Sequence, residues 1–303
     1  MWKEGKKPDQ STFACGLSAC ANLAALQVGK QLHHLIAKSG YVNDLFVSNA
    51  LITMYAKSGR VFDAELLFKD INHADVVSWN SLIGGFALNG YGHEAVKLFE
   101  EMLINGVVPD LVTFVGVLSA CCHAGLVDCG LELFKSMNEV YSVEPLVEHY
   151  ACMVDLLCRA GRLEEAFNMV RGMKIRANAG IWGALLGASR VHQNLELGRY
   201  AAEKLLELEP HKTSNYVLLS HMHAEVGSWE EVERVRVSMK KSRAEKQPGC
   251  SWIELKNQIH AFLSGNQLQP RTAEVCKTLT ALTAHMRNTG DLSEFKSLLD
   301  VFY

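Results

Sequence analysis

The chain repeats a short pattern along most of its length, and this periodicity limits its possible folds more than any other feature. Four glycines that each follow an apolar run stand 31, 35 and 36 residues apart: Gly59, Gly90, Gly125 and Gly161. Glycine commonly ends an α-helix because it readily adopts the left-handed conformation. Helix ends at such regular intervals predict stacked helical hairpins, each too small to bury its apolar residues alone.

Residues 76–110 show the content of one period: "VVSWNSLIGGFALNGYGHEAVKLFEEMLINGVVPD". Two sets of apolar residues at helical spacing lie on either side of a turn signal at 89–92. The first set is Trp79, Leu82, Ile83 and Phe86, and the second is Ala95, Leu98, Phe99, Met102 and Leu103. Asn80 is a poor helix former inside the first set, off its packing face. A single asparagine in a helix is usually solvated or caps a nearby backbone group, so its partner is an open question at this point.

The matching sequences "MWKEGKKPD" at 1–9 and "MLINGVVPD" at 102–110 fix the boundaries of the other periods. We expect an all-α, right-handed α-solenoid of seven stacked helical hairpins with a concave groove, followed by a small C-terminal extension. The predicted units are 1–9 (the end of a truncated repeat), 10–44, 45–75, 76–110, 111–146, 147–178, 179–212, 213–246 and the extension 247–303.

The extension departs from the repeat pattern. The segment "SWIELKNQIHAFL" alternates apolar and polar residues around Lys256-Asn257, which predicts a short β-hairpin. Beyond it, Val275, Leu279, Leu282 and Met286 have helical spacing. The final residues, "GDLSEFKSLLDVFY", fit no single prediction.

Composition narrows the classes of partner and compartment. A net charge of −3 and an isoelectric point near 6.5 give no basic field, so a partner held mainly by phosphate attraction is not indicated. No apolar run approaches the 18 residues that a membrane-spanning helix needs. Nine cysteines without a secretory signal peptide indicate reduced, helix-packing residues in a non-secretory compartment.

Sequence motifs for catalysis or metal binding are incomplete. Zinc-dependent nucleotide deaminases use H-x-E followed by P-C-x-x-C. The chain has "HAE" at 223–225, but it has no C-x-x-C, and "PGCSW" supplies only Cys250. His33-His34 and Cys121-Cys122-His123 lack metal-ligand spacing, so we expect them on the helix surface or in packing contacts. We expect no enzyme, no metal site and no cofactor.

Several segments closely resemble pentatricopeptide repeats (PPR) of the plant PLS subclass, in which long, short and standard repeats alternate: "NSLIGGFALNG", "LITMYAKSGR", "LSACCHAGLVDCG" and "HYACMVDLLCRAGRLEEA". The resemblance assigns types L, S, P, L2 and S2 to 10–44, 45–75, 76–110, 111–146 and 147–178. Residues 179–212 and 213–246 resemble the E1 and E2 motifs, and "QPGCSWIELKNQIHAFLSG" resembles the start of an E+ segment at 247–303.

The resemblance implies binding of single-stranded organellar RNA, with about one base for each repeat. In the family, the fifth and the last residue of a repeat read the base. Asn49 with Asp75 and Asn80 with Asp110 match the family's combination for uracil, and a base edge is a chemically suitable partner for the Asn80 amide. The other predicted reading pairs are Ala14 with Asp44, Val115 with Leu146, and Ala151 with Asn178.

In the family the second residue of a repeat packs against the base. The resemblance gives this role to Phe46, Val77 and Val112. Glu148 stands at the corresponding place in 147–178, where a charged side chain is a poor apolar partner. Val115 and Leu146 offer little hydrogen bonding, so we expect weak discrimination between bases at their junction.

PLS proteins with E motifs mostly specify cytidines for C-to-U editing, and a deaminase-like domain ending in DYW often follows the E+ segment. Because the sequence stops at Tyr303 without it, we expect a site-recognition factor that recruits a DYW-type deaminase protein and other editing factors in trans. Met1 matches Met102, inside a repeat, which indicates an N-terminally truncated chain. A transit peptide for a mitochondrion (slightly favoured) or a chloroplast would lie upstream.

Three other functions remain open. The first is RNA binding for organellar splicing, transcript stability or translation. The second is a tetratricopeptide-like protein scaffold, whose units would have a uniform length of about 34 residues. The unequal spacing of the glycines disfavours it. The third is an enzyme, which the incomplete ligand sets disfavour.

Overall fold

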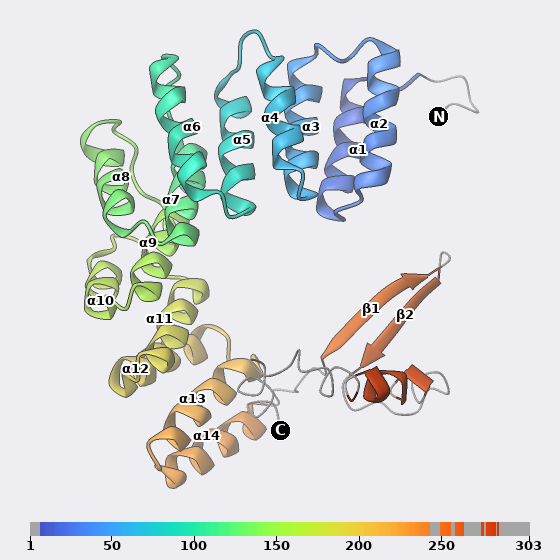
Figure 1. The fold of residues 1–303 in the computed structure, drawn as a ribbon. Coiled ribbons are helices and arrows are strands. Elements are labelled where there is room, and N and C mark those ends of the chain that lie inside the picture. Colours follow the sequence, from blue (N-terminus) through green and yellow to red (C-terminus); the bar gives the residue numbers. More distant parts are fainter. Residues whose placement is uncertain are drawn as a thin grey trace. The chain divides into compact units, whose positions relative to one another are not determined.

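A computed structural model describes residues 7–242, 249–255, 258–263, 274–275, 277–282 and 284. The chain divides into two units, 1–244 and 245–303. In the first unit consecutive helices form antiparallel hairpins that follow one another along the array (Figure 1). The helices are α1 (Gln10–Asn22), α2 (Leu26–Ser39), α3 (Leu45–Lys57), α4 (Val61–Lys69), α5 (Val76–Leu88), α6 (Gly92–Ile104), α7 (Leu111–Ala124), α8 (Val127–Glu139), α9 (Val147–Arg159), α10 (Leu163–Gly172), α11 (Ala179–Val191), α12 (Leu195–Leu208), α13 (Thr213–Glu225) and α14 (Trp229–Lys241).

Local sequence signals begin and end these helices. Asp9, Asp44, Asp75 and Asp110 each precede an odd-numbered helix and accept a hydrogen bond from a backbone N–H of its first turn. Such caps satisfy donors that the helix itself leaves unpaired. At the other end, Gly125 has a φ of 69°, the left-handed conformation that the glycine spacing predicts for a helix end.

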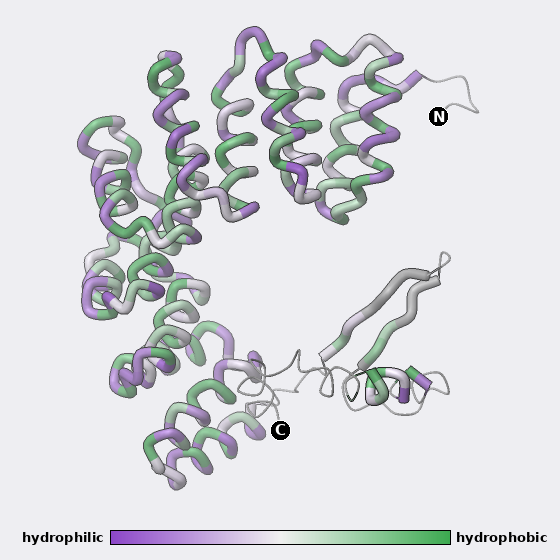
Figure 2. Tube along the Cα trace, in the orientation of Figure 1, coloured by the Kyte–Doolittle hydropathy of each residue, from purple (hydrophilic) through white to green (hydrophobic). Residues whose placement is uncertain are grey.

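The odd-numbered helices contact one another along the array. Each of the five helices α1, α3, α5, α7 and α9 packs against the second helix of its own hairpin and against the next odd-numbered helix. In α5, Trp79, Leu82, Ile83 and Phe86 are all buried, as their spacing predicts. Figure 2 shows apolar and polar residues mixed along each helix, which is the pattern of helices buried on one side only. These contacts confirm the predicted all-α solenoid of helical hairpins.

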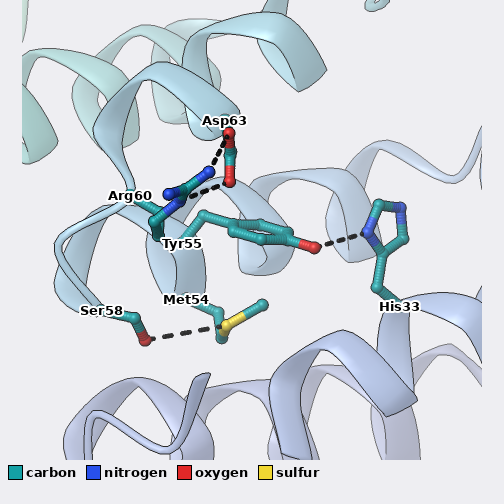
Figure 3. A network of polar contacts seen from close by, with 6 residues as sticks. All are labelled: His33, Met54, Tyr55, Ser58, Arg60 and Asp63. Carbon is teal, nitrogen blue, oxygen red and sulfur yellow. Dashed lines mark hydrogen bonds and ion pairs between the residues drawn. The ribbon is translucent and has the colours of Figure 1, made fainter. Parts of the chain in front are cut away.

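Polar side chains also link neighbouring hairpins. His33 on α2 lies 2.9 Å from the Tyr55 hydroxyl on α3, measured from Nδ1 (Figure 3). Near the ends of later odd-numbered helices, Asn89 donates to the Ala56 carbonyl and His123 contacts the Ala87 carbonyl. Both carbonyls belong to the last turn of the preceding odd-numbered helix, where helical partners are lacking. His33 and His123 therefore have packing roles, as expected from their spacing.

The second unit contains the predicted hairpin. Strand β1 (Cys250–Leu255) pairs antiparallel with β2 (Gln258–Leu263), and Leu255 is paired with Gln258. Residues 274–275, 277–282 and 284 are helical, which agrees with the helix predicted from Val275, Leu279 and Leu282. Met286 and the ambiguous final segment lie outside the described residues. Within the part of the chain that the structure describes, no helix is long and apolar enough to cross a membrane.

Candidate nucleic-acid interface

The structure places the ten predicted reading residues at equivalent points of five successive junctions. Each fifth residue lies on an odd-numbered helix, and each last residue is the N-cap of the next odd-numbered helix. Each pair therefore joins one hairpin to the next. The pairs are Ala14 on α1 with Asp44, Asn49 on α3 with Asp75, Asn80 on α5 with Asp110, Val115 on α7 with Leu146, and Ala151 on α9 with Asn178.

The pair Asn80 and Asp110 is joined directly. Asn80 Nδ2 donates to Asp110 Oδ1 at 3.0 Å, and both side chains are half-buried. Thr113, in the first turn of α7, completes the cluster because its Oγ1 lies 2.6 Å from Asn80 Oδ1. The Thr113 backbone N–H also donates to Asp110 Oδ1, at 2.9 Å. Three side chains from two hairpins thus form one hydrogen-bonded group.

This group fixes which atoms donate and which accept. An ionised carboxylate only accepts hydrogen bonds, so the amide of Asn80 must turn its nitrogen toward Asp110. Its oxygen then faces Thr113, whose hydroxyl has one proton to give. That proton goes to Asn80 at 2.6 Å in preference to Asp110 Oδ1 at 3.0 Å. Within the residues that the structure describes, the Asn80 amide nitrogen donates to Asp110, so its second N–H presents a donor beside an acidic acceptor.

Both cap carboxyls are held in the ionised form. Burial raises the pKa of Asp110, but hydrogen bonds from the Thr113 backbone, the Asn80 amide and the Thr113 hydroxyl lower it more, so the net pKa lies below the ordinary value. The pKa of Asp75 is lowered in the same way, against burial, by the backbone and hydroxyl of Ser78 and by the Asn49 amide. At neutral pH each carboxylate is therefore a permanent acceptor.

The pair Asn49 and Asp75 has the same residue types but different contacts. Asn49 Nδ2 lies 3.4 Å from Asp75 Oδ1, a longer hydrogen bond than that of the Asn80 pair. Ser78 takes the position of Thr113, and its hydroxyl donates to Asp75 at 2.9 Å. Asn49 is buried to 7% exposure, and its Oδ1 has no hydrogen-bond partner. The Asn49 amide is therefore held at its nitrogen only.

The remaining three junctions offer less polar chemistry. Asp44 and Asn178 cap their helices, but their partners Ala14 and Ala151 have no polar side-chain atoms. At the Val115–Leu146 junction the capping group is His149, whose Nδ1 accepts the Leu146 backbone N–H. The other ring nitrogen of His149 lies 2.9 Å from the Leu111 carbonyl. This buried imidazole uses both of its nitrogens inside the protein.

Exposed apolar side chains lie next to the polar pairs. Phe46, Val77 and Val112, the predicted base-packing residues, are the second residues of α3, α5 and α7, and they are 58%, 51% and 61% exposed. Single exposed apolar side chains are common on proteins, and others such as Ile104 and Leu23 are more exposed here, so the informative feature is the repeated position of the three predicted residues. Their recurrence at one helical position supplies an apolar surface beside each of three N-caps. Glu148, at the same position of α9, is exposed and charged.

The sequence prediction missed Thr113 and Ser78. Both are buried and hydrogen-bonded to the cap carboxylate of their own helix, and Thr113 also contacts the preceding hairpin. A signal for them exists, because a hydroxyl residue stands at the third position of α1, α5 and α7: Thr12, Ser78 and Thr113. In α3 the third residue is Val47, and Ser48 follows it.

The "HAE" motif lies at the C-terminal end of α13. His223, the first residue of "HAE", is buried in α13 and takes part in its packing. Within the described residues, no three His, Cys, Asp or Glu side chains are grouped so that they could hold a metal ion.

Comparison with known families gives repeated matches along the chain. Models described as PPR repeat or PPR repeat family match residues 46–75, 74–123, 112–140 and 142–174. A model described as the E motif matches residues 192–254. The match includes α12 to α14 and strand β1 except for its last residue.

Relatives from Arabidopsis thaliana align with nearly the whole chain. Pentatricopeptide repeat-containing protein At2g13600 is 48% identical over 98% of this chain and 43% of its own length. Two others are each 42% identical over 99% of this chain: At2g03880, mitochondrial, over 47% of its length, and CRR2, chloroplastic, over 46%. The chain thus spans less than half the length of these relatives.

Among solved structures, PPR10 in complex with an 18-nt psaJ RNA element has the same fold. The TM-score is 0.62 at 18% identity, over 80% of this chain and 36% of that one. At this identity the likeness concerns the fold alone. The repeat matches, the E motif match and the relatives agree, and the chain belongs to the pentatricopeptide repeat proteins that carry an E motif.

Proposed function

We propose that the chain binds single-stranded RNA of a plant organelle and serves as a site-recognition factor for C-to-U editing. In this proposal a DYW-type deaminase protein and other editing factors act in trans on the RNA that the chain binds. The base-reading residues are the junction pairs, foremost Asn80 with Asp110 and Asn49 with Asp75. Phe46, Val77 and Val112 pack against the bases.

The observation that carries the proposal is the donor and acceptor arrangement of Asn80 and Asp110. Uracil presents a carbonyl at C4 beside an N3–H donor, whereas cytosine presents an amino group beside a bare N3. An amide N–H next to an ionised carboxylate complements the first pattern. The exposed Val77 and Val112 flank this pair in sequence and supply apolar contacts for the faces of a base. Recognition of single-stranded bases generally combines such stacking with contacts to the base edge.

The relatives support the biological setting. At2g03880 is named as mitochondrial and CRR2 as chloroplastic, so we assign the chain to one of these two organelles. PPR10, which shares the fold, was solved with RNA. The E motif match favours editing over the second candidate, a role in splicing or transcript stability.

Equilibrium binding to RNA tests the proposal. Fluorescence anisotropy would compare the purified chain on single-stranded probes that contain every dinucleotide at two adjacent positions in a constant sequence. We expect the tightest binding with two uracils and no binding to the matching duplex. Equal affinity for all dinucleotides, or a preference for duplex, would contradict base reading by the two Asn–Asp pairs.

Transcript sequencing in plants that lack the gene separates the two biological roles. Editing predicts specific organellar cytidines that stay unconverted, each with two adjacent uracils on its 5′ side. Fully edited transcripts with retained introns or altered abundance would support the splicing or stability role instead.

A further inference from the structure

Thr113 lies outside every predicted reading pair, yet it contacts both members of one. Its side chain is fully buried, and its Oγ1 accepts the Asp110 backbone N–H at 3.0 Å. The single hydroxyl proton is directed to Asn80 Oδ1 at 2.6 Å. Thr113 belongs to α7, whereas Asn80 belongs to α5, so this contact crosses the junction between two hairpins.

The contact matters for the direction in which Asn80 can donate. An amide held by its oxygen at Thr113 and by its nitrogen at Asp110 cannot rotate without losing both hydrogen bonds. Its remaining N–H therefore points in one direction. A base that places a carbonyl oxygen opposite this N–H can accept a hydrogen bond and is favoured. A base that places an amino group there brings two donors together and is disfavoured. Thr113 thereby disfavours cytosine relative to uracil.

The preceding junction provides an internal comparison. Ser78 directs its hydroxyl to Asp75, and the Asn49 oxygen is left without a donor. With only the longer bond from its nitrogen, the Asn49 amide can turn its oxygen toward an amino group at lower cost. β-Branched threonine has fewer side-chain rotamers than serine, which helps to explain why the two hydroxyls point to different atoms.

We infer that Thr113 is a positioning residue that sets the preference for uracil over cytosine at the base read by Asn80. The same geometry makes the Asn80 pair more selective than the Asn49 pair, although the two pairs are identical in residue type. This inference rests on the proposed function, since it concerns the selectivity of the same interface.

The test measures the ratio of affinities for uracil and cytosine probes. Thr113→Val keeps the shape but removes the hydroxyl. It also removes part of a helix cap, so some loss of folded protein is expected. That loss lowers affinity for every probe equally and cancels in the ratio. One hydrogen bond is worth about two- to tenfold, so we expect the uracil-to-cytosine ratio to fall by about that factor. Thr113→Ser keeps a hydroxyl but loses the β-branch, so it should restore only part of the ratio.

Ser78→Ala is the matched control, because it removes the equivalent hydroxyl, which donates to Asp75 and not to Asn49. We expect this variant to leave the uracil-to-cytosine affinity ratio unchanged at the base read by Asn49. Ser78→Thr makes the opposite change and should raise the affinity ratio at the same base. It remains informative if Thr113→Val fails to fold, which circular dichroism would reveal. Asn80→Ala identifies which of the two bases belongs to Asn80.

The outcomes separate the inference from the proposed function. A parent chain without any base preference would contradict the proposed function itself. A parent that prefers uracil, with a ratio that Asn80→Ala abolishes but Thr113→Val leaves intact, would overturn the inference alone. If Thr113→Val does not fold, an unchanged ratio in Ser78→Thr would overturn it.

Discussion

Asn80 allows the sharpest test of a single residue. In the family, Thr at the fifth position with Asp at the last favours guanine, so Asn80→Thr should exchange a uracil preference for a guanine preference. Trp79, Ile83 and Phe86 are buried on another side of α5 and stay in place. A base-specific contact is worth about 1–3 kcal/mol, or about tenfold to a hundredfold in relative affinity. Binding to four probes that differ at this one base measures the change. An equal loss on all four would mean that Asn80 supports the fold and does not read a base.

The cysteines should divide into two classes of reactivity. Burial raises the pKa of Cys122 and Cys158 to about 12 and that of Cys152 to about 11, so almost no thiolate exists at neutral pH. Cys15 and Cys250 are exposed. Iodoacetamide at pH 7.5, followed by peptide mass spectrometry, should label the exposed pair and leave the other three unmodified until urea is added. Fast labelling of Cys122 in the folded chain would contradict the packing that the structure gives it.

The residue scale also shows where prediction from sequence stops. The positions of Asn80 and Asp110 followed from the repeat and the family resemblance, and the structure brings them into contact. The role of Thr113 did not follow, because its bond to Asn80 joins residues in different hairpins and depends on which way one hydroxyl turns. Ser78 has the same place in the repeat and turns the other way. A residue type and a position do not determine such a choice.

At the scale of a single helix, the Asp110 N-cap of α7 should contribute to stability in a pH-dependent way. The carboxylate of Asp110 has a lowered pKa, so it stabilises the fold above the ordinary value of about 4 and loses this effect as the pH falls through the lower, folded value. Asp110→Asn keeps a capping oxygen but no charge. We expect it to cost about 0.5–1 kcal/mol at pH 7, a value kept small because solvent screens a half-exposed group.

Urea unfolding midpoints between pH 7 and pH 3 test this. The gap between the parent and Asp110→Asn should close below about pH 4. Glu100→Gln makes the same chemical change on the exposed side of α6, away from any N-cap, and serves as the control. If the difference in urea midpoint stays constant down to pH 3, Asp110 stabilises the fold by packing and not by its charge.

The approach of α6 to α7 depends on one glycine. A Cβ at Gly92 would lie 2.6 Å from the Ala120 carbonyl oxygen and 2.5 Å from Ala124 Cβ, which forces the two helices apart. Gly84 in α5 is the control, because a Cβ there meets nothing within 4 Å. Alanine should stabilise the chain by up to about 1 kcal/mol at Gly84 through helix propensity. At Gly92, overpacking should cost about 1–3 kcal/mol. Urea midpoints should therefore shift in opposite directions, and two upward shifts would contradict the close contact.

For the molecule as a whole, the type of fold could be read from spacing alone. Regular helix ends predicted the hairpin array, and alternation around Lys256-Asn257 predicted the β-hairpin, because both depend on local patterns that repeat or reverse. Contacts such as that of Asn89 with the Ala56 carbonyl could not be read in this way. They depend on how one hairpin is placed on the next, which local pattern does not encode.

The charge of the whole chain leads to the last prediction, that RNA affinity depends weakly on salt. With a net charge of −3, few phosphates can be neutralised, and some basic groups are already paired. Arg159 is bonded to Asp155 and Arg190 to Glu225, so contact with a phosphate would have to break an existing ion pair. For single strands, the logarithm of affinity falls by about 0.7 per neutralised phosphate for each tenfold rise in salt. Titrations of the preferred probe at several salt concentrations should give a slope of about −2 or shallower. A slope corresponding to about eight phosphates would mean that the backbone holds the RNA, and that the junction pairs contribute little of the affinity.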